Sequence, residues 1–186
     1  PHSFPTRRSS DLDVEMLKEY STILGYKLYV CDAISVNDEI VSSSRIRHLI
    51  AEGNIVKANE LLGRPHTIIG KVITGKQLGR TIGFPTVNLN YNKEYILPKG
   101  GVYYTIIEYD NYLYKAITNI GYNPTVEGNK LSVETHILDF NKQIYGEVVK
   151  INFINRIRDE VKFNTIDELK QQLEKDSEYV YNQKIE

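Results

Sequence analysis

The feature that most constrains the fold is a series of short segments, rich in Val, Ile, Thr and Tyr, that begins after Pro65. They are HTIIGKVIT (66–74), GVYYTIIEY (101–109), YLYKAITNI (112–120), KLSVETHIL (130–138) and EVVKINFI (147–154). β-Branched and aromatic residues favour strands, and clusters such as PKGG and GYNP separate the segments. Five or six strands at this spacing predict an antiparallel barrel or sandwich.

Helical patterns precede the strand-rich region. Apolar residues at helical spacing predict a helix that begins at Asp13, and the alternation over 26–36 then predicts a strand. A serine cluster before Ile46 predicts a second helix that ends at Gly53. The segment IVKANELLG predicts a third, short helix that ends at Gly63.

The C-terminal part of the chain predicts a long amphipathic helix. Thr165 and Glu168 have the spacing of a capping box, in which each side chain satisfies a free backbone N–H at the helix start. The apolar face of this helix comprises Ile166, Leu169, Leu173 and Val180. The expected fold is therefore mainly β, with a helical lead-in and a closing helix.

Composition argues against several classes of protein. Lys and Arg total 23 against 24 for Asp and Glu, so the chain lacks the positive charge of a sequence-independent nucleic-acid binder. A single cysteine, Cys31, excludes an intrachain disulfide and is typical of the reducing cytoplasm. No apolar run approaches the ~18 residues of a membrane span. We expect a cytoplasmic protein that binds neither nucleic acid nor membrane.

The first twelve residues, PHSFPTRRSSDL, show neither a periodic pattern nor the apolar core of a signal peptide. We expect residues 1–12 to be a non-native leader. The alternative is a native basic arm that carries Arg7 and Arg8, but it would bury nothing and matches no targeting signal.

A glycine-rich loop, GKQLGRTIG (75–83), precedes the segment FPTVN. Such a loop can bring backbone N–H groups close to phosphate oxygens, and Arg80 can add a charged donor. Thr86 and Asn88 are two residues apart, so in a strand they share a face, and their hydroxyl and amide oxygens suit Mg²⁺ beside phosphates. The alternative is an ordinary hairpin connection followed by a strand without a ligand.

The segment SVETH places Ser132, Glu134 and His136 on one face of a predicted strand, with Val133 and Thr135 on the other. A carboxylate on a rigid strand is a plausible general base toward an alcohol. The alternative for Glu134 is a solvated surface residue, because glutamates are mostly exposed.

A charged stretch is expected between the last strand and the closing helix. It comprises Arg156, Arg158, Asp159, Glu160 and Lys162. Most such stretches are solvated loops, although a guanidinium here can also lie against a planar ligand ring.

Six blocks in fixed order, GRTIGFPTVNL, LPKGGVYY, NIGYNPTV, SVETHILDF, IYGEVVKINF and IRDEVKF, resemble riboflavin kinase. The whole chain from about residue 41 resembles the C-terminal part of the bacterial bifunctional riboflavin kinase/FAD synthetase. The resemblance implies a six-stranded, Greek-key type antiparallel barrel with a C-terminal helix. It also implies transfer of the ATP γ-phosphate to the ribityl 5′-hydroxyl of riboflavin, which yields FMN and ADP with Mg²⁺ as cofactor.

The resemblance also implies roles for individual residues. Glu134 matches the catalytic base, and Thr86 and Asn88 match the element that holds Mg²⁺ at the ATP phosphates. Other implied ATP-binding residues are Gly75, Gly79, Arg80, Thr86 again and Tyr145. Arg158 and Phe163 match positions beside the flavin, and Asn123 lies in a block near the site.

Upstream of the barrel, the segment from Val41 to His66 resembles the end of the family's adenylyltransferase domain. The matching residues of its phosphate-contacting motif are Ser42, Ser43, Ser44, Arg45 and Arg47. We therefore expect residues 13–64 to be an α/β remnant of a nucleotidyltransferase domain and residues 65–186 to be the kinase domain. Because no HxGH-type element precedes the motif, we expect riboflavin phosphorylation without FMN adenylylation, and an adenylyltransferase domain in cis in the parent protein.

Two other functions remain as alternatives. A non-catalytic flavin- or nucleotide-binding barrel would keep the fold without turnover, but such a binder has no need of a base at Glu134. An oligonucleotide-binding barrel is disfavoured by the near-neutral charge and the absence of a basic, aromatic-rich stripe.

Overall fold

The computed structural model describes residues 13–75, 78–125 and 128–185, with the backbone alone described at residue 78, over 122–125 and over 128–130. The expected leader, residues 1–12, lies outside the described residues. The chain divides into two compact units, Pro1–Ile40 and Val41–Glu186. The expected boundary between remnant and kinase domain, at residues 64 and 65, follows from the family resemblance and stays a prediction.

The first unit contains α1 (Val14–Leu24) and a hairpin of β1 (Ser35–Val36) and β2 (Glu39–Ile40). The expected first helix is confirmed: Asp13 caps it by accepting from the Met16 N–H at 2.7 Å. The strand expected over 26–36 is wrong except for its last two residues. A strand needs a partner for its backbone groups, and here most apolar side chains of the alternating segment are solvent-exposed, with Tyr29 at 81%.

The second unit begins with α2 (Ser43–Glu52) and α3 (Ile55–Leu62), which confirm both helices expected there. Ser42 caps α2 by accepting from the Arg45 N–H at 3.3 Å, and Gly53 ends it in the left-handed conformation. The helices bury Leu49, Ile50, Ile55, Ala58 and Leu61.

One side chain of α3 connects this helical pair to the barrel. Asn59 donates to the Phe153 carbonyl at 2.9 Å and accepts from the His66 N–H at 2.7 Å. The two helices therefore belong to the same compact unit as the strands that follow.

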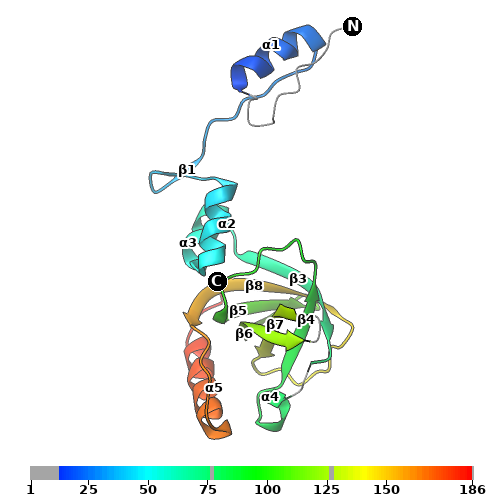
Figure 1. The fold of residues 1–186 in the computed structure, drawn as a ribbon, viewed down its shortest axis with the longest axis vertical. Coiled ribbons are helices and arrows are strands. Elements are labelled where there is room, and N and C mark those ends of the chain that lie inside the picture. Colours follow the sequence, from blue (N-terminus) through cyan, green and yellow to red (C-terminus); the bar gives the residue numbers. More distant parts are fainter. Residues whose placement is uncertain (1–12, 76–77, 126–127, 186) are drawn as a thin grey trace. The chain divides into compact units, whose positions relative to one another are not determined.

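The rest of the unit is a closed antiparallel barrel of six strands, which confirms the predicted fold (Figure 1). The strands are β3 (His66–Ile73), β4 (Thr86–Tyr91), β5 (Gly101–Tyr109), β6 (Tyr112–Thr125), β7 (Gly128–Ile137) and β8 (Val148–Arg158). Their spatial order is β3-β4-β7-β6-β5-β8. In this order β5, β6 and β7 are consecutive neighbours and β8 returns beside β5, which is a Greek key.

Alternate residues fill the barrel interior with large apolar side chains. The fully buried set includes Ile68, Tyr103, Ile107, Ile120, Val133, Ile151 and Phe153. Three buried threonines lie among them and satisfy one another: Thr118 Oγ1 is 2.8 Å from Thr105 Oγ1 and 2.9 Å from Thr135 Oγ1. A buried hydroxyl without a partner would destabilise the core, so the polar atoms occur as a connected set.

The last element, α5 (Ile166–Tyr181), packs on the outer face of the barrel, where Val180 joins a cluster with Val102, Tyr104 and Ile117 (Figure 1). The capping box is confirmed, since Thr165 accepts from the Glu168 N–H at 3.1 Å. The Glu168 carboxylate accepts from the Asn164 N–H at 2.9 Å, one residue before the cap.

Two local predictions need correction. Strand β8 continues to Arg158, so Arg156 and Arg158 lie in the sheet and not in the loop that follows it. The glycine-rich loop contains a one-turn helix, α4 (Leu78–Thr81), which includes Gly79 and Arg80. At Arg156 and Arg158 strand β5 supplies the backbone partners, which a local pattern does not reveal.

Candidate active site

A single row of register partners runs across five strands of the barrel and carries three of the predicted site residues. On this row Asn88 of β4 pairs with Glu134 of β7, and Glu134 pairs with Asn119 of β6. Asn119 then pairs with Val102 of β5, and Val102 with Arg158 of β8. Directly paired residues place their side chains on the same face of a sheet, so the sheet brings Asn88, Glu134 and Arg158 onto one surface. This is the outer surface that α5 partly covers.

Strand β7 presents its faces as the sequence predicts. Val133, Thr135 and Ile137 are buried, whereas Ser132, Glu134 and His136 are only partly buried. Glu134 lies between two amide side chains in adjacent strands, and His136 lies opposite Thr86. A carboxylate in this position is held by the sheet yet remains open to a ligand.

The glycine-rich loop packs closely against β4. A Cβ atom at Gly75 would lie 1.9 Å from Asn88 Nδ2, and one at Gly79 would lie 2.2 Å from the Phe84 carbonyl oxygen. The Phe84 N–H in turn donates to the Gly79 carbonyl at 2.8 Å. Glycine is therefore required at both positions so that the loop can approach the strand that carries Thr86 and Asn88.

A pocket of about 280 Å³ lies between α4, the row of paired residues and the first half of α5. Its polar lining comprises Thr86, Asn119, Glu134, His136, Arg158 and Glu160. Its apolar lining includes Phe84, Val102, Ile117, Phe163, Leu169 and Leu173. An apolar pocket with a few convergent polar groups is the usual form of a small-molecule site, although this one is at the small end of the ~300–1,000 Å³ range.

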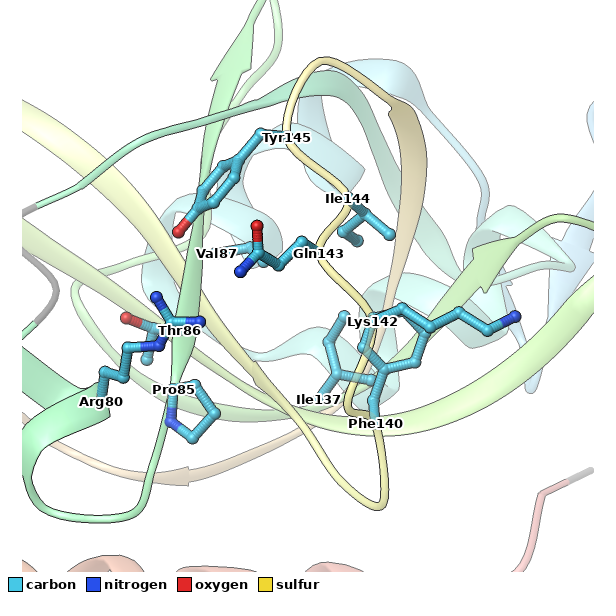
Figure 2. A pocket seen from close by; sticks show the side chains of 10 residues that line it. All are labelled: Arg80, Pro85, Thr86, Val87, Ile137, Phe140, Lys142, Gln143, Ile144 and Tyr145. Atoms are coloured by element: carbon cyan, nitrogen blue, oxygen red, sulfur yellow. The ribbon is translucent and has the colours of Figure 1, made fainter.

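A second pocket, of about 60 Å³, lies on the other side of Thr86 (Figure 2). Figure 2 shows the polar ends of Arg80, Thr86, Gln143 and Tyr145 at one end of this pocket, while the Lys142 amine points away. Thr86 lines both pockets, so it stands where the two meet. The structure thus brings Arg80, Thr86 and Tyr145 together, although they come from separate segments.

Arg158 lies in the wall of the larger pocket as half of an ion pair. Its Nη2 is 2.7 Å from Asp176 Oδ2, and its Nε is 3.1 Å from both carboxylate oxygens. Asp176, on α5, is only 2% exposed and also accepts from Gln172 at 2.9 Å. The guanidinium is therefore held by α5, and its predicted contact with a flavin stays a prediction.

Arg156 points to a different part of the barrel. Its Nη2 donates to Asp159 Oδ1 at 2.6 Å and to the Gly100 carbonyl at 2.7 Å, and its Nε donates to Tyr103 Oη at 3.3 Å. The hydrogen bond from Arg156 holds the pKa of the Asp159 carboxyl below its usual value. This arginine supports the loop after β8 and lines neither pocket.

The remaining predicted residues are Asn123 and the serine and arginine motif near the start of the second unit. Asn123 lies on β6, where its side chain is outside the described part of the chain. The motif of Ser42, Ser43, Ser44, Arg45 and Arg47 lies at the start of α2, and its side chains are exposed. None of these motif residues lines either pocket.

Among the described residues, no group of three or more His, Cys, Asp or Glu side chains could hold a metal ion. The oxygen atoms available beside the loop are the Thr86 hydroxyl, the Asn88 amide and the Glu134 carboxylate. These hard donors fit Mg²⁺, which usually binds few protein ligands and takes the rest from phosphates and water. Within the same described part of the chain, no helix is long and apolar enough to cross a membrane.

The family model for Flavokinase, described as riboflavin kinase, matches residues 62–183. The chain belongs to the riboflavin kinase family. Among curated proteins it is 43% identical over 150 residues to the bifunctional riboflavin kinase/FMN adenylyltransferase of Bacillus subtilis (strain 168), covering 79% of this chain and 48% of that protein.

Other matches agree with this membership of the riboflavin kinase family. The protein of the same name from Haemophilus influenzae (strain Rd) is 37% identical over 164 residues, covering 88% of this chain and 53% of the relative. The chain thus spans about half the length of the curated relatives it matches. A crystal structure named as a macrolide-efflux protein from Streptococcus pneumoniae has a TM-score of 0.84 and 36% identity, covering 96% of this chain and 58% of that one.

The sequence did not point to one residue that lines the larger pocket, Asn119. Its Nδ2 is 3.2 Å from Glu160 Oε1, and both side chains line the larger pocket. A Cβ at Gly121 would lie 2.3 Å from the same carboxylate oxygen, so glycine leaves room for Glu160 on the strand. The only signal for Asn119 in the sequence is an amide side chain at the end of a predicted strand. That Asn119 lies beside Glu134 depends on the register of β6 and β7.

Proposed function

We propose that this chain transfers the γ-phosphate of ATP to the ribityl 5′-hydroxyl of riboflavin, giving FMN and ADP. The observation that carries the proposal is the register pair of Asn88 and Glu134, with Thr86 at the junction of two pockets. Phosphoryl transfer asks little covalent chemistry of a protein and depends on positioning and charge stabilisation. The Thr86 hydroxyl at the junction, together with the paired Asn88 amide and Glu134 carboxylate, meets these needs.

Glu134 is the proposed general base. In the reaction the 5′-oxygen bonds to the γ-phosphorus, the bond from that phosphorus to the bridging oxygen of ADP breaks, and the hydroxyl proton passes to the Glu134 carboxylate. The rigid strand β7 holds this carboxylate against the larger pocket. A base on a sheet needs no reorganisation before it accepts the proton.

Thr86 and Asn88 are the proposed holders of Mg²⁺ beside the phosphates. The ion, when bound, would neutralise charge that develops on the phosphoryl oxygens. The close approach of Gly75 to Asn88 and of Gly79 to Phe84 supports a loop that lies directly over the phosphates, with Arg80 as a charged donor.

The two pockets suggest the two substrates. The larger pocket, with Phe163 and the aliphatic residues of α5, has the apolar walls that an aromatic ring system needs. The smaller pocket, with Arg80 and Tyr145, is too small to enclose a nucleoside, so it would take only part of ATP. In this arrangement the hydroxyl and the γ-phosphate meet at Thr86.

The test is an assay of the purified chain with riboflavin, ATP and Mg²⁺, in which FMN and ADP are separated and quantified. Equal amounts of FMN and ADP are expected, with no FMN when ATP is left out or the metal is chelated. Absence of FMN under all conditions would overturn the proposal. Quenching of riboflavin fluorescence without turnover would instead support a non-catalytic flavin-binding barrel.

A further inference from the structure

His136 makes a contact that connects the strand of Glu134 to the segment before Thr86. Its Nδ1 lies 2.8 Å from the Pro85 carbonyl oxygen. His136 and Thr86 are register partners, and both line the larger pocket. The imidazole therefore connects β7 to Pro85, the residue immediately before β4.

The start of β4 has few other backbone connections. Strand β3 pairs with β4 only over Asn88–Tyr91, so Thr86 is paired on one side only, by β7. Pro85 has no N–H and cannot extend the ladder as a donor. Its carbonyl can still accept a hydrogen bond, and His136 binds that group.

The same imidazole also contacts the glycine-rich loop. The ring of Phe84 meets that of His136 edge-on, with centroids 5.3 Å apart and planes at 63°. The Phe84 N–H in turn donates to the carbonyl of Gly79 in α4 at 2.8 Å, so His136 is connected to α4 through Phe84. His136 thus contacts both Pro85 in the turn and Phe84, which is hydrogen-bonded to the glycine-rich loop.

The chemistry of the contact determines which ring nitrogen carries hydrogen. A backbone carbonyl only accepts, so the hydrogen bond requires hydrogen on Nδ1 of His136. In the neutral ring Nε2 is then the unprotonated nitrogen. The ring is held in one orientation by the hydrogen bond from Nδ1 and by the edge-on contact with Phe84.

We propose that His136 is a positioning residue that holds the Phe84–Pro85–Thr86 turn at a set distance from Glu134. This inference rests on the proposed function, because its consequence is the alignment of the phosphate side of the site with the base. A displacement of about 1 Å between reacting groups can cost about 10²-fold in rate.

Three variants separate the hydrogen bond from simple ring packing. His136→Asn keeps an N–H at the place of Nδ1 without the ring. His136→Phe keeps a ring against Phe84 without the donor, and His136→Gln offers an N–H only at the place of Nε2. His48→Phe, at an exposed position on α2, is the matched control.

The readouts are kcat, the KM values for ATP and riboflavin, and hydrogen exchange of the backbone amides over residues 78–88. His136→Phe and His136→Gln are expected to lose about 10–100-fold in kcat and to exchange faster over 78–88. His136→Asn is expected to retain most of the wild-type kcat and protection. A general loss of stability would impair all three variants alike.

The inference is overturned if His136→Phe matches the wild type in kcat and in exchange, or if His136→Asn is as impaired as His136→Phe. Exchange over 78–88 reports on the turn whether or not the chain turns over riboflavin. A wild-type chain that forms no FMN would contradict the proposed function, while the exchange pattern would still decide the role of His136.

Discussion

Asn88 and Glu134 face each other directly across β4 and β7. A shift of one residue in this register would move one of the two side chains to the opposite face of the sheet. Such a shift is unfavourable, because it would expose the buried side chains of Val133, Thr135 and Ile137. The apolar core of the barrel therefore maintains the relationship between the amide and the carboxylate.

Glu134→Gln tests the base. The amide keeps the size of the side chain but cannot take up the hydroxyl proton, so kcat for FMN formation is expected to fall by about 10²–10⁴-fold. The KM for ATP should change little. Glu174→Gln, at an exposed position on α5, is the control and should keep the wild-type rate. A Glu134→Gln enzyme with the full kcat would remove this residue from the role of base.

Gly75→Ala tests the contact between the loop and Asn88. The added methyl would lie 1.9 Å from Asn88 Nδ2 and 2.6 Å from its Cγ, so the Asn88 side chain must move away. The expected result is a loss in kcat/KM for ATP of up to about 10²-fold, with a higher Mg²⁺ concentration needed for half-maximal rate.

Gly100→Ala provides the matched control for that substitution. A Cβ at Gly100 meets nothing closer than the Ile120 carbonyl oxygen at 3.5 Å, an ordinary contact distance. Its kinetics should resemble those of the wild type. If Gly75→Ala also kept the wild-type dependence on ATP and Mg²⁺, the proposed role of Asn88 would be in error.

Asp176→Ala tests the ion pair that connects α5 to β8. The substitution leaves the Arg158 guanidinium, which is 19% exposed, without its carboxylate. Breaking a buried pair by removing one partner typically costs about 3–5 kcal/mol of unfolding free energy. Urea unfolding followed by circular dichroism measures this cost. Glu178→Ala, exposed on the same helix, should change the free energy of unfolding by less than about 0.5 kcal/mol.

His66 predicts a pH dependence of stability. Burial lowers its pKa below the usual 6.5, and nearby Arg64 lowers it further, although the hydrogen bond to the Ile96 carbonyl opposes the shift. The unfolded chain therefore takes up a proton at higher pH than the native chain. The free energy of unfolding should be unaffected by this group above about pH 6.5 and should decrease as the pH falls from there toward the native pKa.

His66→Gln keeps a donor for the Ile96 carbonyl but does not titrate. The measurement is the free energy of unfolding at about pH 7.5 and about pH 5.5 for both proteins. The wild type is expected to lose more stability than His66→Gln over this interval. An equal loss in the two proteins would assign the pH dependence to other groups.

Local sequence patterns predicted most of the elements in the second unit. Ser42 and Gly53 mark the ends of α2, Thr165 marks the start of α5, and the alternation around Glu134 matches its burial. The same kind of pattern failed over 26–36, where the described residues offer no neighbouring strand that pairs with more than Ser35 and Val36. Alternation indicates a surface that could form a strand, but pairing requires a partner.

Propensity, capping and alternation act over a few residues, so the sequence by itself determined most of the strands of the barrel, the helices other than α4, and the motifs that carry the family resemblance. Only the tertiary structure decided that Asn119 adjoins Glu134, that Asp176 holds Arg158, and that His136 reaches Pro85. Each of these pairs joins segments far apart in the chain. Strand order and register decide such contacts, and they follow from burial of the whole core and not from any local run of residues.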